Sequence, residues 1–93
     1  MDAPPLRDFT RTLDGCVERQ FIMRTASDTC PCGYRYPLHL GPLVGKTIIR
    51  YDNSHELEKG HERHTSTSVE QIEFPGMIEL IDRFEREIDH QIE

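Results

Sequence analysis

The sequence predicts an α+β fold, in which an antiparallel sheet of four to six strands is packed by one C-terminal amphipathic helix. Two observations support this prediction. Short segments of alternating apolar and polar residues, separated by turn residues, fill most of the chain, and an apolar stripe at helical spacing follows them. A helix and a sheet that each have one apolar face bury those faces against each other. With 93 residues, we expect 1–93 to be a single small domain, with 1–5 as a loose N-terminal tail.

A hairpin is predicted at the start of the sheet. Its strands are residues 6–13 and 16–25, and they flank the pair Asp14-Gly15. Asp-Gly between two alternating segments is a strong signal for a tight β-turn. The alternation in the second strand predicts the following core-facing side chains: Val17, Phe21 and Met23.

The remaining strands are predicted from four further segments. Residues 34–40 are extended but contain Pro37, which confines such a segment to a sheet edge or a bulge. Residues 46–52 are rich in β-branched and aromatic side chains, and a polar loop over 53–60 follows them. The last predicted strands are residues 61–66 and 68–74.

The final segment predicts a helix over 75–90. Apolar residues recur there every three or four positions, with charged residues between them. Pro75 suits the first helical turn, where a missing backbone N–H costs nothing. The predicted apolar stripe is Met77, Ile78, Ile81, Phe84, Ile88 and Ile92.

Composition restricts the class of protein. No apolar run is long enough to span a membrane, and no signal-peptide pattern is present. Three cysteines, an odd number, argue against a closed disulfide framework, so we expect a cytoplasmic location. The net charge of −6 argues against a broad, nonspecific grip on nucleic acid, although it leaves room for a local basic pocket.

One stretch, from Arg50 to His64, concentrates the groups that transfer protons or bind phosphate. It begins with Arg-Tyr-Asp-Asn at the end of a predicted strand and contains three of the five histidines. Its candidate residues are Arg50, Tyr51, Asp52, Asn53, His55, His61, Arg63 and His64. Any functional site is expected in this stretch.

This order of features resembles the TumE-like family of toxin–antitoxin toxins, over about residues 34–90. The residues that match the family motif are Arg50, Tyr51, Asp52, Asn53 and His55, followed by His61 and His64. The chain departs from the pattern in the two residues between His61 and His64 and in the loop Cys30-Pro31-Cys32. The resemblance implies a growth-inhibiting toxin that acts on RNA and is neutralised by a cognate antitoxin with a DNA-binding domain.

The residue types fit metal-independent RNA cleavage. That reaction needs a base for the 2′-hydroxyl proton, an acid for the leaving oxygen and positive charge on the phosphate. Histidine suits both proton-transfer roles, and arginine suits the phosphate. The expected proton-transfer residues are His55 with His64 or His61, of which we rank His64 higher. On a regular strand His61 and His64 point to opposite faces, so both serve one site only if a bulge intervenes or one of them lies in the loop.

The other roles follow from the same chemistry. Arg50 or Arg63 is expected to hold phosphate, and Asp52 to orient a histidine. Tyr51 is expected to stack on a base or to donate its hydroxyl. The further candidates for substrate binding are Asn53 and Arg35. His39, outside this stretch, is expected to be structural or exposed.

Alternatives remain open at this stage. One is a non-enzymatic module that binds a partner protein through a sheet edge or the helix face. Another is a divalent ion held by Asp52, His55, His61 and His64. A third is a small domain stabilised by zinc, for which the ligands would be Cys30 and Cys32 with Cys16 or His39. The first choice requires no cofactor.

Overall fold

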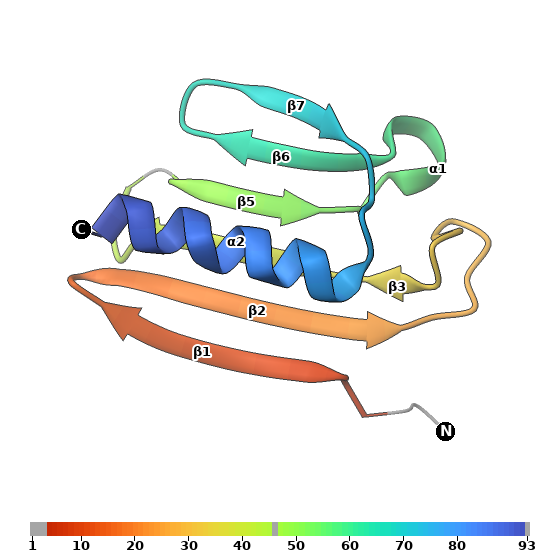
Figure 1. Ribbon diagram of the computed structural model, residues 1–93, viewed down its shortest axis with the longest axis horizontal. Helices are drawn as coiled ribbons and strands as arrows, with labels where there is room; N and C mark the ends of the chain where they lie inside the picture. The colour runs from red at the N-terminus through yellow and green to blue at the C-terminus, as the bar shows by residue number, and fades with distance from the viewer. Residues whose placement is uncertain (1–3, 46, 93) are drawn as a thin grey trace.

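One long helix lies across an antiparallel sheet, as the sequence predicts (Figure 1). This computed structural model describes residues 4–45 and 47–92. The strands are β1 (Arg7–Leu13), β2 (Cys16–Arg24), β3 (Tyr34–Arg35), β4 (Pro37–Pro42), β5 (Ile49–Asp52), β6 (His61–Thr65) and β7 (Val69–Ile72). The helices are α1 (Glu56–Lys59) and α2 (Met77–Ile92). Lys46 and residues 1–3 of the predicted tail lie outside the described residues.

The strands follow the order β1-β2-β4-β5-β6-β7, and each pairs antiparallel with its neighbour. The two-residue β3 pairs with the end of β2, beside this path. Pro37 does not mark a sheet edge, because β4 lies between β2 and β5. It is instead the first residue of β4, a position at which a missing N–H does not interrupt the sheet.

The predicted hairpin turn is confirmed. Leu13 and Cys16 pair across it, and Asp14 and Gly15 have φ angles of 48° and 79°. A two-residue turn whose central residues both have positive φ matches the right-handed twist of the strands that it joins. The predicted polar loop over 53–60 differs from the structure, since it contains the single-turn helix α1.

The inward face of β2 is the opposite of the predicted one. Its buried side chains are Glu18, Gln20 and Ile22, whereas Val17, Phe21 and Met23 are half-buried on the other face. Neighbouring polar groups explain this result. The Nε atoms of Arg11 and Arg7 on β1 donate to Glu18 at 2.6 Å and to Gln20 at 2.5 Å, respectively. Buried polar groups are tolerated when they are hydrogen-bonded, and a pattern of apolar residues cannot reveal such partners.

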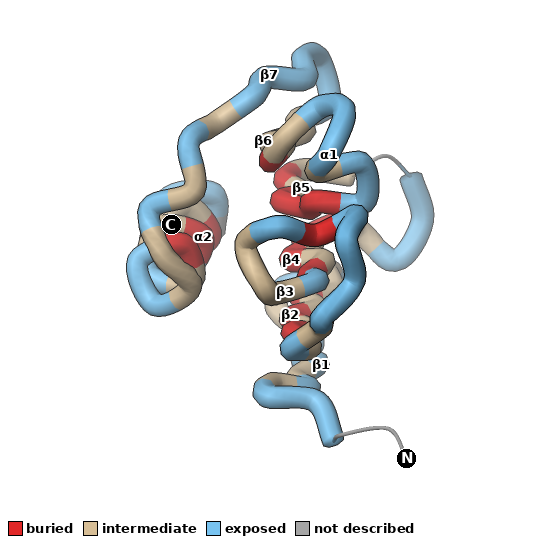
Figure 2. Tube along the Cα trace, turned by 90° about the vertical axis from the view of Figure 1, so that its right-hand side faces the viewer, coloured by how far each residue is buried: buried red, intermediate tan, exposed pale blue. Residues whose placement is uncertain are grey.

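The core lies between α2 and the inward face of β2, β4 and β5 (Figure 2). Its buried residues are Ile22, Tyr36, Leu38, Leu40, Ile49, Tyr51, Leu80, Phe84 and Ile88. The predicted helix stripe is right at Phe84 and Ile88 and wrong at Ile78, which is 83% exposed. Leu80 occupies the core instead, because it lies one turn before Phe84 on the same helix face. The side chain of Ile92 lies outside the described residues.

The opposite face of the sheet is not covered by a helix within residues 4–45 and 47–92, and Figure 2 shows α2 on one side only. Across the same residues, no helix has the length and apolar character needed to cross a membrane.

Phe84→Ala should lower the free energy of unfolding by about 3 to 5 kcal/mol, because it empties a buried position that contacts the Tyr51 ring. Ile78→Ala, on the exposed side of the same helix, should change it by less than about 0.5 kcal/mol. Urea unfolding followed by circular dichroism measures both values. Equal losses in the two variants would contradict this packing of α2.

Candidate functional site

Four basic or imidazole side chains form a row across the helix-free face of the sheet. Arg50 on β5 lies directly opposite His39 on β4 and His64 on β6, and Arg19 on β2 lies opposite His39. Side chains of directly opposed residues share one face, with Cβ atoms about 4.5 to 5.5 Å apart. Because alternate residues such as Tyr51 point into the core, this row points away from α2.

Two carboxylates lie beside the row. Asp52 and Glu62 are opposed residues of β5 and β6, two positions along from Arg50 and His64. We call the six residues Arg19, His39, Arg50, Asp52, Glu62 and His64 the open face. The Nε of Arg50 donates to Oδ2 of Asp52 at 2.7 Å. The Nε2 of His64 lies 3.9 Å from Asp52 and 3.8 Å from Glu62.

His64 has an unsatisfied atom. Its Nε2 is buried and has no hydrogen-bond partner within the described part of the chain. A buried polar atom without a partner costs about 1 to 3 kcal/mol. The side chain of Arg50 is 43% exposed beside it. Of the two side chains, Arg50 is the one that a phosphate oxygen on this face can contact directly.

His39 joins the site although the sequence indicated only a structural or exposed role. Its Nε2 lies 3.0 Å from Oγ1 of Thr47, in the connection between β4 and β5. Its ring lies over Gly41, where an added Cβ would come within 2.9 Å of Cε1. Burial, and then the positive charge of Arg50, lower the pKa of His39 below its ordinary value of 6.5. His39 is therefore neutral at neutral pH and able to accept a proton.

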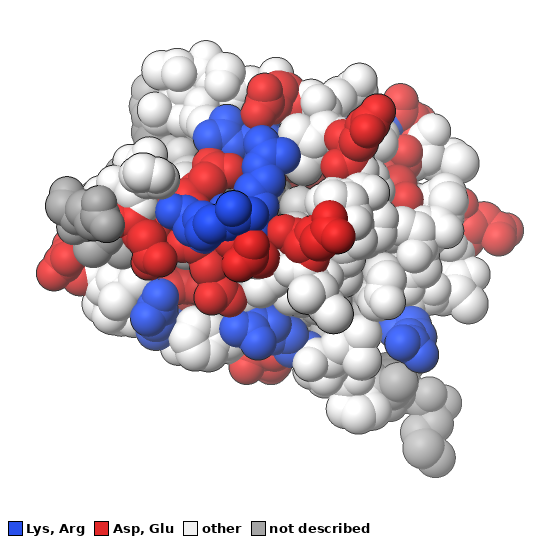
Figure 3. Space-filling view, in the orientation of Figure 1, with Lys and Arg blue, Asp and Glu red and all other residues white. Residues whose placement is uncertain are grey.

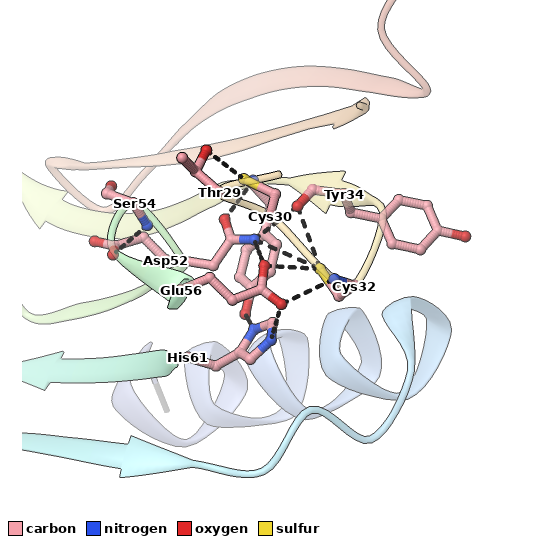
Figure 4. Close-up of polar contacts among 10 residues, drawn as sticks. Thr29, Cys30, Cys32, Tyr34, Asp52, Ser54, Glu56 and His61 are labelled. Carbon is pink, nitrogen blue, oxygen red and sulfur yellow. Dashed lines mark hydrogen bonds and ion pairs between the residues drawn. The ribbon is translucent and has the colours of Figure 1, made fainter. Parts of the chain in front are cut away.

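Two of the predicted site residues, Asn53 and His61, form hydrogen bonds to neighbouring elements at one end of the sheet. The side-chain amide of Asn53 donates to the carbonyl of Tyr34 at 2.6 Å and accepts from the backbone N–H of Tyr36 at 3.1 Å. The Nδ1 of His61 lies 2.6 Å from the hydroxyl of Tyr36, and its Nε2 lies 3.2 Å from Glu56 (Figure 4). His61 and His64 point to opposite faces, as regular strand alternation requires.

Two more predicted residues face the helix. Tyr51 is fully buried and donates to Glu87 of α2, so it is a core residue and is not available to stack on a base. Arg63 donates from Nη2 to Glu87 at 2.6 Å and from Nε to both carboxylate oxygens. Burial raises the pKa of Glu87. On this side of the molecule, positive and negative side chains are interleaved (Figure 3).

The last two predicted residues are exposed. His55 precedes α1 and lines a shallow hollow of about 110 Å³ with Thr29, Ser54, Leu57 and Glu58. Arg35 lies on β3, opposite Met23. The structure thus brings Arg50, Asp52 and His64 together and places the other candidates elsewhere.

Neither predicted metal set is brought together. Cys16 begins β2, whereas Cys30 and Cys32 follow its far end, and a strand of nine residues separates them. At about 3.3 Å per residue this distance is far too long for shared ligation. His39 lies on the open face, away from this loop. The other set fails because His61 and His64 lie on opposite faces of the sheet.

The described residues contain two other groups with metal-ligand chemistry. One is Asp52, Glu62 and His64 on the open face, and the other is Cys32, Glu56 and His61 at the end of the sheet. In each group the ligand atoms lie within 4.8 Å of one another.

Comparison with known proteins gives one match. The family model described as Toxin TumE matches residues 7–92. No curated protein and no solved structure matches the chain. The matched region includes every residue of the open face.

The imidazole of His39 should titrate with a midpoint below 6.5 in an NMR pH titration of its Cε1 proton. Arg50→Gln should raise this midpoint, because the positive charge that disfavours the imidazolium is removed. Burial, the larger cause, remains, so the midpoint should stay below 6.5. Arg83→Gln, on the helix side, serves as the control and should leave it unchanged. A midpoint that does not respond to Arg50→Gln would contradict this arrangement.

Proposed function

Because this chain belongs to the TumE toxin family, we propose that it inhibits growth by cleaving RNA on the open face of its sheet. Membership of the family implies a toxin of a toxin–antitoxin pair, with a cognate antitoxin. The observation that carries the proposal is the row His39-Arg50-His64, in which one guanidinium lies between two imidazoles. We include in the proposal an antitoxin that carries a DNA-binding domain.

The two imidazoles suit opposite proton transfers. His39, held neutral by burial and by Arg50, takes the proton of the 2′-hydroxyl. The 2′-oxygen then attacks the adjacent phosphorus, and the bond to the 5′-oxygen breaks. His64 gives a proton to that leaving oxygen. Each histidine is next to Arg50 in register, so both reach a phosphate that Arg50 binds.

The carboxylates orient the row. Asp52 accepts from the Nε of Arg50 at 2.7 Å, which fixes the plane of the guanidinium. The terminal nitrogens of Arg50 then face the phosphate, where their planar fork donates parallel hydrogen bonds. Asp52 and Glu62 each lie within 4 Å of the Nε2 of His64, and both form an ion pair with it whenever the imidazole carries its second proton.

The open face offers RNA a surface for stacking. Arginines on both sides of the sheet pair with acidic residues: Arg7–Glu85, Arg63–Glu87, Arg83–Glu87 and Arg86–Asp82 on the helix side, and Arg19–Asp8 and Arg50–Asp52 on the other. On the opposite face Arg19 lies over the half-buried ring of Phe21, with its Cζ 5.2 Å from the ring centroid. Aromatic rings and arginine planes are the surfaces on which unpaired RNA bases stack.

Removal of either imidazole should abolish toxicity. His64→Ala and His39→Ala should each slow RNA cleavage by about 10²- to 10⁴-fold, the usual contribution of a general acid or base. His55→Ala, in the hollow beside α1, is the matched control and should stay toxic. The measurements are growth after induction, with and without the neighbouring gene, and sequencing of RNA 5′ ends. Full toxicity of folded His39→Ala and His64→Ala would reject the proposal.

Gly41→Ala should reduce cleavage without unfolding the protein. The added Cβ would come within 2.9 Å of the His39 ring, and the ring, being the end of a side chain, moves aside. A double-mutant cycle tests this cause: in the His39→Ala background, Gly41→Ala should have no further effect. A similar loss of activity in both backgrounds would show that Gly41 does not act through His39.

A further inference from the structure

A second cluster of reactive side chains lies at the end of the sheet, on elements distant in sequence. Cys32 lies in the loop before β3, Glu56 is the first residue of α1 and His61 is the first residue of β6 (Figure 4). The Sγ of Cys32 lies 3.1 Å from one carboxylate oxygen of Glu56, and the Nε2 of His61 lies 3.2 Å from the other. From these contacts we propose that Cys32, Glu56 and His61 form a zinc site.

The ligand types and spacing fit zinc. Thiolate, carboxylate and imidazole are the side chains that bind Zn²⁺, with bonds of about 2.0 to 2.3 Å. In a tetrahedral site such bonds separate neighbouring ligand atoms by about 3.3 to 3.7 Å. The contacts of 3.1 and 3.2 Å reach the two different oxygens of the Glu56 carboxylate, and one ligand atom from each of the three residues lies within 4.8 Å of the others. Three protein ligands leave the fourth position for water.

The surrounding residues already hold the ligands in place. The hydroxyl of Tyr36 lies 2.6 Å from the Nδ1 of His61. A metal-bound histidine characteristically donates its second ring N–H to such an acceptor, which fixes the ring and leaves Nε2 for the metal. Asn53 donates to Glu56 at 2.9 Å, and the backbone N–H of Cys32 does so at the same distance. His61 itself is only 6% exposed.

Zinc must displace the proton of the Cys32 thiol. Burial raises the pKa of Cys32 to about 11, and the hydrogen bond to Glu56 and the negative charge of that carboxylate add to the effect. Burial would raise the pKa of Glu56 too, but hydrogen bonds from Cys32 and Asn53 outweigh it and lower the pKa. Zinc binding releases the thiol proton to solvent and places two positive charges between thiolate and carboxylate.

The open-face group is a weaker candidate for the metal. There the guanidinium of Arg50 already neutralises Asp52 at 2.7 Å. Within the described residues, the Glu56 carboxylate forms no ion pair with Lys or Arg. Zinc at this position would link the loop that contains Cys32 to α1 and β6, and would stabilise the end of β5. The ion would not lie on the open face.

The test measures zinc in the purified full-length protein. Native mass spectrometry of wild type with added Zn²⁺ should give one ion per chain. Cys16→Ser, which leaves the cluster intact, should bind equally, whereas Cys32→Ser and His61→Ala should each bind at least tenfold more weakly. Tyr36→Phe should weaken binding by about 10- to 100-fold, as loss of such a supporting hydrogen bond does. Zinc should raise the melting temperature of wild type and Cys16→Ser but not of Cys32→Ser.

A second measurement needs no variant. Co²⁺ in place of zinc should give the sulfur-to-cobalt charge-transfer absorption of a bound thiolate in the wild-type protein. No bound zinc in the folded wild type, no thiolate absorption with Co²⁺, or full binding in Cys32→Ser would each overturn the proposal. Loss of zinc in Asp52→Asn with retention in Cys32→Ser would assign the ion to the open face and also overturn it.

Discussion

The register between β4, β5 and β6 decides which side chains face α2 and which lie on the open face. Tyr51 lies opposite Leu38 and Arg63, and Arg50 lies opposite His39 and His64. A shift of one residue in any of these pairings would turn every side chain of that strand to the other face. Burial prevents such a shift, because it would place Arg50 and Asp52 under α2 and expose Tyr51.

Because side chains alternate along β5, the residues of the motif Arg-Tyr-Asp-Asn lie in three different parts of the molecule. Arg50 and Asp52 lie on the open face, where they pair with each other. Tyr51 lies in the core against Phe84 and donates to Glu87. Asn53, after the strand ends, joins Glu56 to the backbone around Tyr34. Arg50 and Asp52 are therefore positioned by the core residue Tyr51 between them and by the hydrogen bonds of Asn53 after them.

The sequence predicted those features whose causes are local. The Asp14-Gly15 turn and the helix stripe through Phe84 and Ile88 depend on neighbours along the chain, and both are confirmed. The inward face of β2 could not be predicted, because Glu18 is stabilised by Arg11 on another strand. His39 was missed for the same reason: its place beside Arg50 depends on strand pairing. The candidate stretch supplied Arg50, Asp52 and His64. Strand alternation separates His61 from His64, as the sequence predicts, but which of the two faces α2 covers depends on tertiary packing.

The proposed RNA-binding surface is the helix-free face of the sheet. The five histidines differ in position, so their signals show where RNA binds. His39 and His64 lie on that face, and His61 is buried at the end of the sheet. His55 and His90 are exposed elsewhere. The most direct measurement follows their imidazole NMR signals during titration with a short RNA whose 2′-hydroxyls are methylated to prevent cleavage. We expect large shifts at His39 and His64 and small ones at His55 and His90. Shifts confined to His55 or His90 would show that RNA binds elsewhere.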